Sequence, residues 1–356
     1  MVTASHNPKD YNGFKLCRED AIALSGDAGL GEIRDLIVRE NLPAAAEYPG
    51  SVEETDITED YAEHCLGFID TEGLRPLKIV IDAGNGMAGK MVPPIFEHLP
   101  FEYMPMYFEL DGSFPHHPPN PIEPENVREL QEIVVAEGAD FGVSFDGDAD
   151  RCFIIDEKGT TISGDLAATL IAKNVLEKEP GATILYSAVC SKAFPELVER
   201  EGGKAIRTKA GHSIIKPQMR ENDAAFGGEH SAHFYFRDNY FADSGIIAML
   251  TVAELVGRQE SPISELLAPI DPYVRSGEIN SEVEDQEATM TKVEDHYSEA
   301  EDVKTDHLDG LTVDLGDWWF NLRPSNTEPL LRLNVEASDK ETMEHRRDEL
   351  LELIRE

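Results

Sequence analysis

The chain has 356 residues, 41% of them hydrophobic, and its 70 acidic and 31 basic residues give a net charge of −39. This charge argues against nucleic acid and anionic membranes as partners, because both need basic surface. No apolar run reaches the roughly 18 residues of a membrane span, no signal-peptide pattern opens the chain, and the four cysteines are too scattered for a disulfide framework. We therefore expect a cytoplasmic protein of about two to four domains.

The excess of carboxylate also favours a particular environment. Such a surface keeps a protein soluble in strong salt, where screening reduces repulsion to a range of about 3 Å at 1 M. We therefore expect a halophilic host with a salt-rich cytoplasm. An anionic substrate would need basic residues gathered locally.

Short apolar runs alternate with helical patterns through most of the chain, which is typical of α/β layers with largely parallel sheets. In chain order, the patterns predict a strand at 12–18, a helix at about 29–40, a strand at 78–86, a helix at 126–138, two strands within 139–156, a helix at 165–179, a strand at 182–188, a helix at 192–202, a strand at 204–213, two short strands within 224–236, a helix at 243–257, strands within 310–337 and a helix at 340–356.

The pattern changes after about residue 270, where a very acidic stretch precedes strands around a loop and an amphipathic helix. This part is expected to form a separate α+β unit. The first 60 residues are also distinct, and they are too few to bury a full core alone. The predicted units are 1–58, 59–163, 164–269 and 270–356.

The strongest local signal is DGDADR at 146–151, where Asp146, Asp148 and Asp150 alternate between two predicted strands. Closely spaced carboxylates repel unless a cation neutralises them, and hard oxygen ligands suit Mg²⁺ or Ca²⁺. An ordinary acidic surface turn is an alternative in so acidic a chain. An EF-hand is disfavoured, because Arg151 occupies the sixth loop position, where the sharp turn demands Gly.

Two further stretches have the composition of ligand-binding loops. RPSNTEP at 323–329 combines an arginine with hydroxyl and amide donors, which suits a phosphate, although a hydrogen-bonded turn explains it equally well. GGEHSAH at 227–233 contains Glu229, Ser231 and His233, which could bind sugar hydroxyls.

Two more stretches carry reactive or basic side chains. TASHNP at 3–8 contains Ser5, a candidate nucleophile, directly before His6, and Lys15 follows. RTKAGHSIIK at 207–216 gathers Lys209 and His212 with other basic residues, and either attracts anions or forms a solvated basic face.

In this order, the five motifs TASHNP, DGDADR, KAGHS, GEHSAH and RPSNTEP resemble those of the α-D-phosphohexomutases, in particular the phosphomannomutase/phosphoglucomutase branch. The resemblance runs from residue 2 to the C-terminus. It implies three α/β units, the first incomplete, followed by a C-terminal α+β domain.

The resemblance implies a role for each motif. Ser5 would carry the phosphoryl group as phosphoserine, and the three aspartates of DGDADR would bind Mg²⁺ beside it. Arg151 would position the phosphoserine, while His6 and Lys15 are the candidates for general acid and base. Glu229 and Ser231 would bind sugar hydroxyls, and Lys209 and His212 would line the cleft. The non-reacting phosphate would be bound by Arg323, Ser325, Asn326 and Thr327.

The implied reaction interconverts hexose 6-phosphate and hexose 1-phosphate, of mannose, glucose or both. It passes through a hexose 1,6-bisphosphate, which also serves as activator. His230 lies inside the sugar motif, and either tunes the choice among glucosamine, glucose and mannose or is a spacer. A phosphoglucosamine mutase is therefore an alternative, and a homodimer is compatible with the resemblance.

The chain departs from the family at its start. Family members have a full first domain, with a Gly-Ile-Arg-Gly-like stretch before the serine loop, whereas here Met1 directly precedes VTAS. We expect residues 1–58 to be the second half of that domain, with an open sheet edge. A catalytically weak remnant that binds sugar phosphate and Mg²⁺ is the corresponding alternative function.

Overall fold

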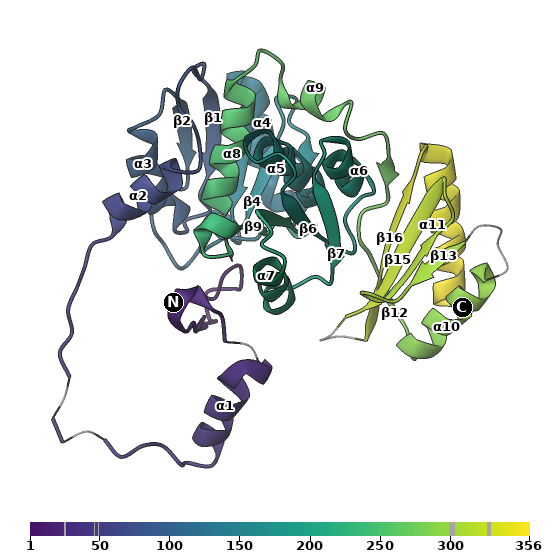
Figure 1. The fold of residues 1–356 in the computed structure, drawn as a ribbon, viewed down its shortest axis with the longest axis horizontal. Coiled ribbons are helices and arrows are strands. Elements are labelled where there is room, and N and C mark those ends of the chain that lie inside the picture. Colours follow the sequence, from purple (N-terminus) through teal and green to yellow (C-terminus); the bar gives the residue numbers. More distant parts are fainter. Residues whose placement is uncertain (25, 46, 49, 299–302, 326–328) are drawn as a thin grey trace.

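The computed structural model describes residues 1–24, 26–45, 47–48, 50–298, 303–325 and 329–356. Figure 1 shows a central α/β body, a smaller C-terminal body beside it, and an N-terminal segment below it. This mixed α/β architecture confirms the predicted fold class.

The first sheet of the central body has the strand order β2-β1-β3-β4-β5. Strands β1, β2 and β3 are parallel, whereas β4 and β5 are antiparallel to their neighbours. The elements of this part are α2 (Thr58–Leu66), β1 (Lys78–Asp82), α3 (Ala88–Phe96), β2 (Glu102–Met106), α4 (Pro124–Glu137), β3 (Phe141–Phe145), β4 (Cys152–Ile155) and β5 (Thr161–Ile162).

Local sequence signals explain where α4 begins and ends. Pro124 lies at its first position, where a missing N–H costs little. Gly138 follows the helix with φ 57°, and its N–H bonds back to Val134 and Val135. A residue with a side chain rarely adopts this left-handed conformation, so glycine ends the helix there.

The second sheet has the strand order β10-β9-β8-β6-β7, with β7, β6 and β8 parallel and β9 and β10 antiparallel to their neighbours. Its elements are α5 (Gly164–Lys178), β6 (Thr183–Ser187), α6 (Ala193–Arg200), β7 (Lys204–Thr208), α7 (His212–Glu221), β8 (Phe226–Gly228), β9 (Phe234–Phe236), the 3-10 turn Arg237–Asn239, β10 (Ala242–Asp243), α8 (Gly245–Gly257) and α9 (Ile263–Leu267).

The two sheets of the central body share one hydrophobic core. Helix α8 runs through its middle, and all 13 of its residues are buried (Figure 1). Its apolar residues extend around the whole helix, which is the pattern of a helix enclosed on every side. The continuous core fixes the loops of one sheet relative to those of the other.

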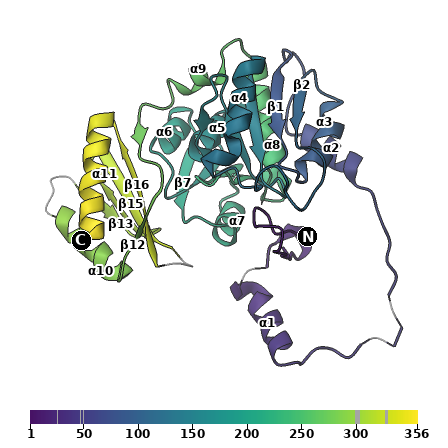
Figure 2. The ribbon, with the colours of Figure 1, turned by 180° about the vertical axis from the view of Figure 1, so that it is seen from behind.

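The C-terminal body is an antiparallel sheet with the order β11-β16-β15-β14-β13, in which β12 also pairs with β16. Figures 1 and 2 show α10 and α11 on the side of this sheet away from the central body. Its elements are β11 (Val274–Arg275), β12 (Ile279–Glu282), α10 (Gln286–Tyr297), β13 (Lys304–Asp306), β14 (Leu311–Asp314), β15 (Trp318–Pro324), β16 (Leu330–Ala337) and α11 (Lys340–Arg355).

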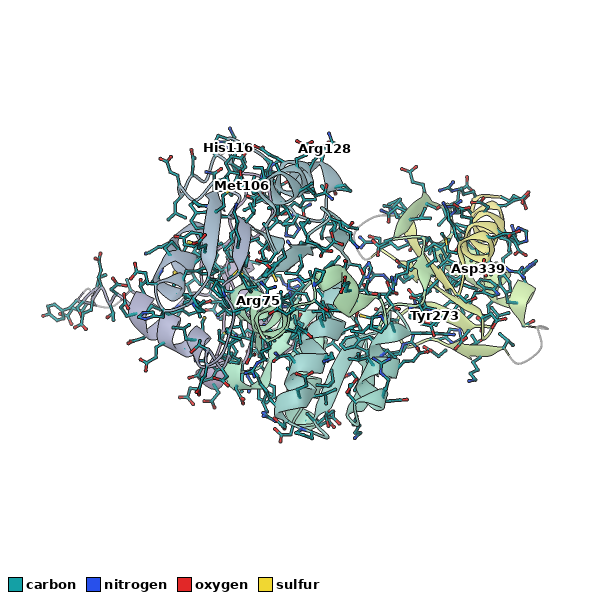
Figure 3. All side chains as sticks on the ribbon, turned by 90° about the horizontal axis from the view of Figure 1, so that it is seen from above. Arg75, Met106, His116, Arg128, Tyr273 and Asp339 are labelled. Carbon is teal, nitrogen blue, oxygen red and sulfur yellow. The ribbon has the colours of Figure 1, made fainter. Side chains whose placement is uncertain are left out.

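Polar contacts join the C-terminal body to the central body. Tyr273 lies at the junction of the two (Figure 3), and its hydroxyl donates to Glu196 at 2.7 Å. The Lys192 ammonium donates to Asp314 at 2.6 Å, and the Lys192 backbone N–H donates to Glu336 at 3.0 Å. An interface of such contacts depends on charge and hydrogen bonding.

The N-terminal segment contains the 3-10 turn Glu19–Ala21, a π-helical turn at Gly26–Leu30 and α1 (Gly31–Val38), which has no buried residue. The strand predicted at 12–18 is wrong. Val2 pairs with Phe14, and Cys17 with Ala23, only as isolated bridges, because none of the described strands lies beside them. In the described parts of the chain, no helix combines the length and the apolar character needed to cross a membrane.

Candidate active site

The predicted site loops follow strand ends in the central body. The aspartate loop 146–151 follows β3, the 209–211 turn follows β7, and the sugar-motif loop 229–233 follows β8. In open α/β sheets, ligands bind outside the carboxyl ends of the parallel strands, and all three strands end on such an edge. An antiparallel bridge between Arg151 and His233 joins the loops of the two sheets.

The three aspartates of DGDADR point their carboxylates at one spot. One oxygen of each lies within 4.8 Å of the others. The second oxygens Oδ1 of Asp148 and Asp150 are buried and have no hydrogen-bond partner among the described residues. Buried, unpartnered carboxylate oxygens fit a hard cation, so these residues could bind Mg²⁺.

Lys15 lies at the same carboxylates. Its ammonium forms ion pairs with Asp148, at 2.9 Å, and with Asp150. Burial alone would lower the pKa of Lys15, but the two carboxylates outweigh it and raise the pKa above its ordinary value. Lys15 is therefore held as a cation in this arrangement, and its role as general acid or base stays a prediction.

Ser5 is placed directly above the aspartate loop. Its hydroxyl donates to Asp146 at 3.0 Å and lies 3.2 Å from Nδ1 of His6. Its φ of 53° is rare for a serine. Thr3 supports this turn, since its hydroxyl accepts from the Ser5 N–H at 2.8 Å and donates to Asp148 at 2.9 Å.

Arg151 donates to the same Asp146 oxygen as Ser5 and is only 3% exposed. Its Nε donates to Asp146 at 2.9 Å, whereas its Nη2 is buried and finds no partner in the described parts of the chain. A buried guanidinium with one free donor is suited to an anion held beside Ser5.

Burial and neighbouring charges shift the pKa values of two side chains in this cluster. Burial, followed by the charge of Asp150, raises the pKa of Asp146 to about 7. Burial and the nearby Arg151 lower the pKa of His6, which is therefore neutral at neutral pH. A neutral imidazole beside a hydroxyl can accept or return its proton.

The sugar motif is tied into its surroundings through Glu229, which is 4% exposed. This carboxylate accepts from the Gly211 N–H, from Ser231 and from Tyr235, each at 3.0 Å. Glu229 and Ser231 line a cavity of about 280 Å³ together with Arg323. The structure thus brings the predicted sugar and phosphate residues together across two bodies.

The phosphate loop is described only in part. Arg323 lies at the end of β15 and Ser325, which is largely buried, follows it. Asn326 and Thr327 lie outside the described residues. Lys209 is exposed, and its ammonium makes no ion pair with any described side chain.

The sequence offered no reason to connect Asp243 or Lys216 with the site, and it suggested His233 only as a possible ligand of sugar hydroxyls. Asp243 accepts from His233 at 3.0 Å and pairs with His212 at 3.3 Å and Lys216 at 2.8 Å. Burial alone would raise the pKa of Asp243, but these partners hold it well below its usual range. His233 also lies 4.0 Å from Asp150, so this cluster borders the aspartate loop. His233 was named within the GGEHSAH motif, but nothing in the sequence connects it to Asp243.

Comparison with known proteins identifies the fold domain by domain. The four domains of phosphoglucomutase/phosphomannomutase, I to IV, match residues 1–42, 59–159, 163–273 and 278–353. Phosphohexose mutases of Xanthomonas campestris are 44% identical over all of this chain and 79% of their own length. The chain belongs to this family. Phosphomannomutase of Escherichia coli K12 is 43% identical, again over the whole chain and 79% of the relative.

Solved structures agree with this assignment. A phosphoglucomutase/phosphomannomutase family protein of Burkholderia thailandensis has a TM-score of 0.87 and 32% identity, over 99% of this chain and 75% of that one. N-acetylphosphoglucosamine mutase of Aspergillus fumigatus shares the fold, with a TM-score of 0.69 at 15% identity over 99% and 88%. The protein is therefore an intramolecular phosphotransferase of the hexose phosphate mutase type.

Proposed function

We propose that the protein interconverts the 6- and 1-phosphates of mannose and glucose, with Ser5 as the phosphoryl carrier. The observation that carries this proposal is the surroundings of Ser5. Its hydroxyl lies 3.0 Å from Asp146, and the same Asp146 oxygen accepts from the buried and partly unpartnered Arg151. A hydroxyl among an arginine and three carboxylates is suited to a phosphate that is held with a cation.

The proposed transfer proceeds in two steps, from Ser5 to the hexose and then from the hexose back to Ser5. The bond from Ser5 Oγ to phosphorus breaks while the free hydroxyl of the hexose monophosphate bonds to that phosphorus and loses its proton. This yields the 1,6-bisphosphate and free Ser5. After the bisphosphate turns over, Ser5 Oγ bonds to its other phosphorus and loses its hydroxyl proton, while the bond from that phosphorus to the hexose oxygen breaks and this oxygen takes up a proton. We propose that His6 exchanges the hydroxyl proton with Ser5, because Nδ1 of His6 lies 3.2 Å from the Ser5 hydroxyl.

The charged groups explain how transfer would be favoured. Phosphoryl transfer depends mainly on positioning and on neutralising the equatorial oxygens. The Nη2 of Arg151 and the ammonium of Lys15 supply fixed positive charge from this chain. Mg²⁺, when bound by the three aspartates, would further neutralise charge at the reacting phosphate. The A. fumigatus mutase was solved with GlcNAc-6P and magnesium, which supports this assignment.

The choice of mannose and glucose rests on the relatives and on the sugar motif. Phosphomannomutases of E. coli and Salmonella typhimurium are each 43% identical to this chain. Glu229 and Ser231 offer an acceptor and a donor at the 280 Å³ cavity that Arg323 also lines. Clamping the non-reacting phosphate at Arg323 would position either sugar for reaction.

A coupled assay tests this function. Mannose 1-phosphate and glucose 1-phosphate are supplied with Mg²⁺ and a trace of hexose 1,6-bisphosphate. Turnover of both sugars is expected, and Ser5→Ala should lower it by about three orders of magnitude or more. Ser51→Ala, at an exposed serine far from the site, serves as the matched control. Absence of turnover with both sugars, or full activity of Ser5→Ala, would contradict the proposal.

Metal removal provides a second test. Chelation should abolish turnover, because without a cation the carboxylates of Asp146, Asp148 and Asp150 repel the phosphate, and added Mg²⁺ should restore it. Full turnover in excess chelator would show that these aspartates have another role.

A further inference from the structure

Two arginines lie next to each other on adjacent strands of the C-terminal sheet. Arg323 on β15 pairs directly with Arg332 on β16. Directly opposed residues of antiparallel strands project from the same face, and like charges in this arrangement repel. The side chains are only 21% and 33% exposed, so water screens the repulsion incompletely.

Glu278 neutralises this pair. It follows Gly277, whose φ of 69° turns the chain, and directly precedes β12. One carboxylate oxygen accepts from Arg323 at 2.8 Å, and the other forms an ion pair with Arg332 at 3.4 Å. One carboxylate therefore serves two guanidiniums, and the trio keeps a net positive charge.

The two guanidiniums retain capacity for more acceptors. The Nε atoms of Arg323 and Arg332 are buried and make no hydrogen bond within the part of the chain that the structure describes. The trio lines the cavity of about 280 Å³ that also borders Glu229 and Ser231. An anion that enters beside the sugar motif therefore meets guanidiniums already paired with a carboxylate.

We propose that Glu278 is a built-in competitor for the phosphate of the substrate, and so sets the affinity of this site. A phosphate dianion displaces it from the arginines, and it returns when the phosphate leaves. The inference rests on the proposed function, in which Arg323 binds the non-reacting phosphate.

The exchange has a consequence for the bisphosphate intermediate. That intermediate must release one phosphate from the arginines before it presents the other. Leaving two partly buried guanidiniums without a counter-ion is strongly unfavourable. Because Glu278 replaces the departing phosphate, the arginines remain paired during the exchange. The competition by Glu278 weakens phosphate binding and thereby favours release of the phosphate from the arginines.

Glu278→Gln tests this role directly, because it keeps the shape and removes the competing charge. Apparent affinity falls with the fraction of molecules whose site is blocked, so the Kd values for inorganic phosphate and mannose 1-phosphate should decrease by about three- to tenfold. Calorimetric titration measures both without requiring turnover. In the assay, KM should fall as well, while kcat does not rise.

Two variants control the experiment. Glu282→Gln removes the same charge from an exposed position four residues along and should leave both Kd values unchanged. Glu278→Asp keeps the charge on a shorter arm that reaches the arginine pair less well, and should bind phosphate with intermediate affinity. It also allows the comparison to proceed if Glu278→Gln folds poorly.

The opposite sign overturns the inference. If Glu278→Gln binds phosphate as weakly as, or more weakly than, the unaltered chain, Glu278 orients the arginines and does not compete. Arg323→Ala separates this result from failure of the proposed function. If Arg323→Ala weakens binding while Glu278→Gln does not tighten it, only the competitor role is wrong. If Arg323→Ala leaves Kd unchanged, the phosphate site itself is misassigned.

Discussion

Two nitrogens of the Arg151 guanidinium differ in their hydrogen bonding. Its Nε is fixed by Asp146, whereas its Nη2 is buried without a partner among the described residues. Such a donor carries a desolvation penalty unless an acceptor arrives. Arg151 Nη2 is thus available to the anion that we propose Ser5 carries, and the buried Nε atoms of Arg323 and Arg332 are available to an anion in the same way.

Arg151→Lys removes this prepared donor and keeps the charge. A charge-assisted hydrogen bond is worth about 1.5–3 kcal/mol, so kcat should fall by about 10- to 100-fold. KM should change little, because we propose that the substrate's own phosphate binds at Arg323. Steady-state assays measure the two separately, with Arg128→Lys on the exposed face of α4 as control (Figure 3). Equal activity of the Arg151→Lys and Arg128→Lys variants would show that Arg151 has no role in the reaction.

At the scale of elements, close backbone approaches position the serine loop. A Cβ added to Gly147 would lie 2.4 Å from the carbonyl oxygen of Ser5. Apolar packing contributes little to holding the N-terminal segment, since Val2 and Phe14 are largely exposed. The alignment of Ser5 with Asp146 therefore depends on a glycine at this position.

Gly147→Ala should displace the serine loop without unfolding the central body. A misplacement of about 1 Å can lower a rate by about 100-fold, and a loss of that order in kcat is expected. The thermal midpoint should stay near that of the unaltered chain, because the displaced loop adds little buried surface. Gly112→Ala, where a Cβ meets nothing within 4 Å, is the control. Unaltered kcat in Gly147→Ala would show that the contact is unimportant.

His230 links the sugar motif to α5. It lies 3.4 Å from Asp165, which is 1% exposed, with Arg323 and Glu278 nearby. Burial alone would lower the pKa of His230, but the charge of Asp165 outweighs it and raises the pKa. The pair therefore stabilises the fold fully below about pH 6.5, and this contribution is lost as pH rises through the raised pKa.

His230→Gln should accordingly lower the free energy of unfolding more at pH 6 than at pH 9. Each unit of raised pKa corresponds to about 1.4 kcal/mol. Urea unfolding at both pH values measures the difference, and His98→Gln, at an exposed histidine, should show none. An equal loss at both pH values would mean that His230 is neutral in the folded protein.

The elements differed in how well the sequence predicted them. The aspartate loop was predicted because all its chemistry lies within six consecutive residues between two β-type runs. Lys216, His233 and Asp243 come from α7, the turn before β9, and β10, so their meeting depends on how the sheet pairs. The Glu278–Arg332 contact was not predicted for the same reason. The strand at 12–18 failed because strand propensity needs a neighbouring strand to pair with.

At the scale of the whole molecule, a charge of −39 surrounds a site for an anion. The basic residues that would attract a phosphate are gathered where the bodies meet, in agreement with an anionic substrate. Elsewhere, surplus carboxylates repel one another across the surface, and this repulsion opposes the compact state. The contacts of Lys192 and Arg207 with the C-terminal body also depend on the salt concentration.

Salt should therefore stabilise this chain. At molar KCl the screening length is about 3 Å, against about 30 Å at 0.01 M, so the repulsion among carboxylates largely disappears. The thermal unfolding midpoint is expected to rise from low to molar KCl. An equal midpoint at both concentrations would contradict this expectation.

We propose that Ser5 carries the phosphoryl group, and phosphate mapping tests this most directly. The protein is incubated with Mg²⁺ and glucose 1,6-bisphosphate, and the phosphate is located by peptide mass spectrometry. One phosphate is expected, on Ser5, which is lost on adding hexose monophosphate and never appears in Ser5→Ala. A phosphate at another residue, or an active enzyme that never carries phosphate on Ser5, would contradict it.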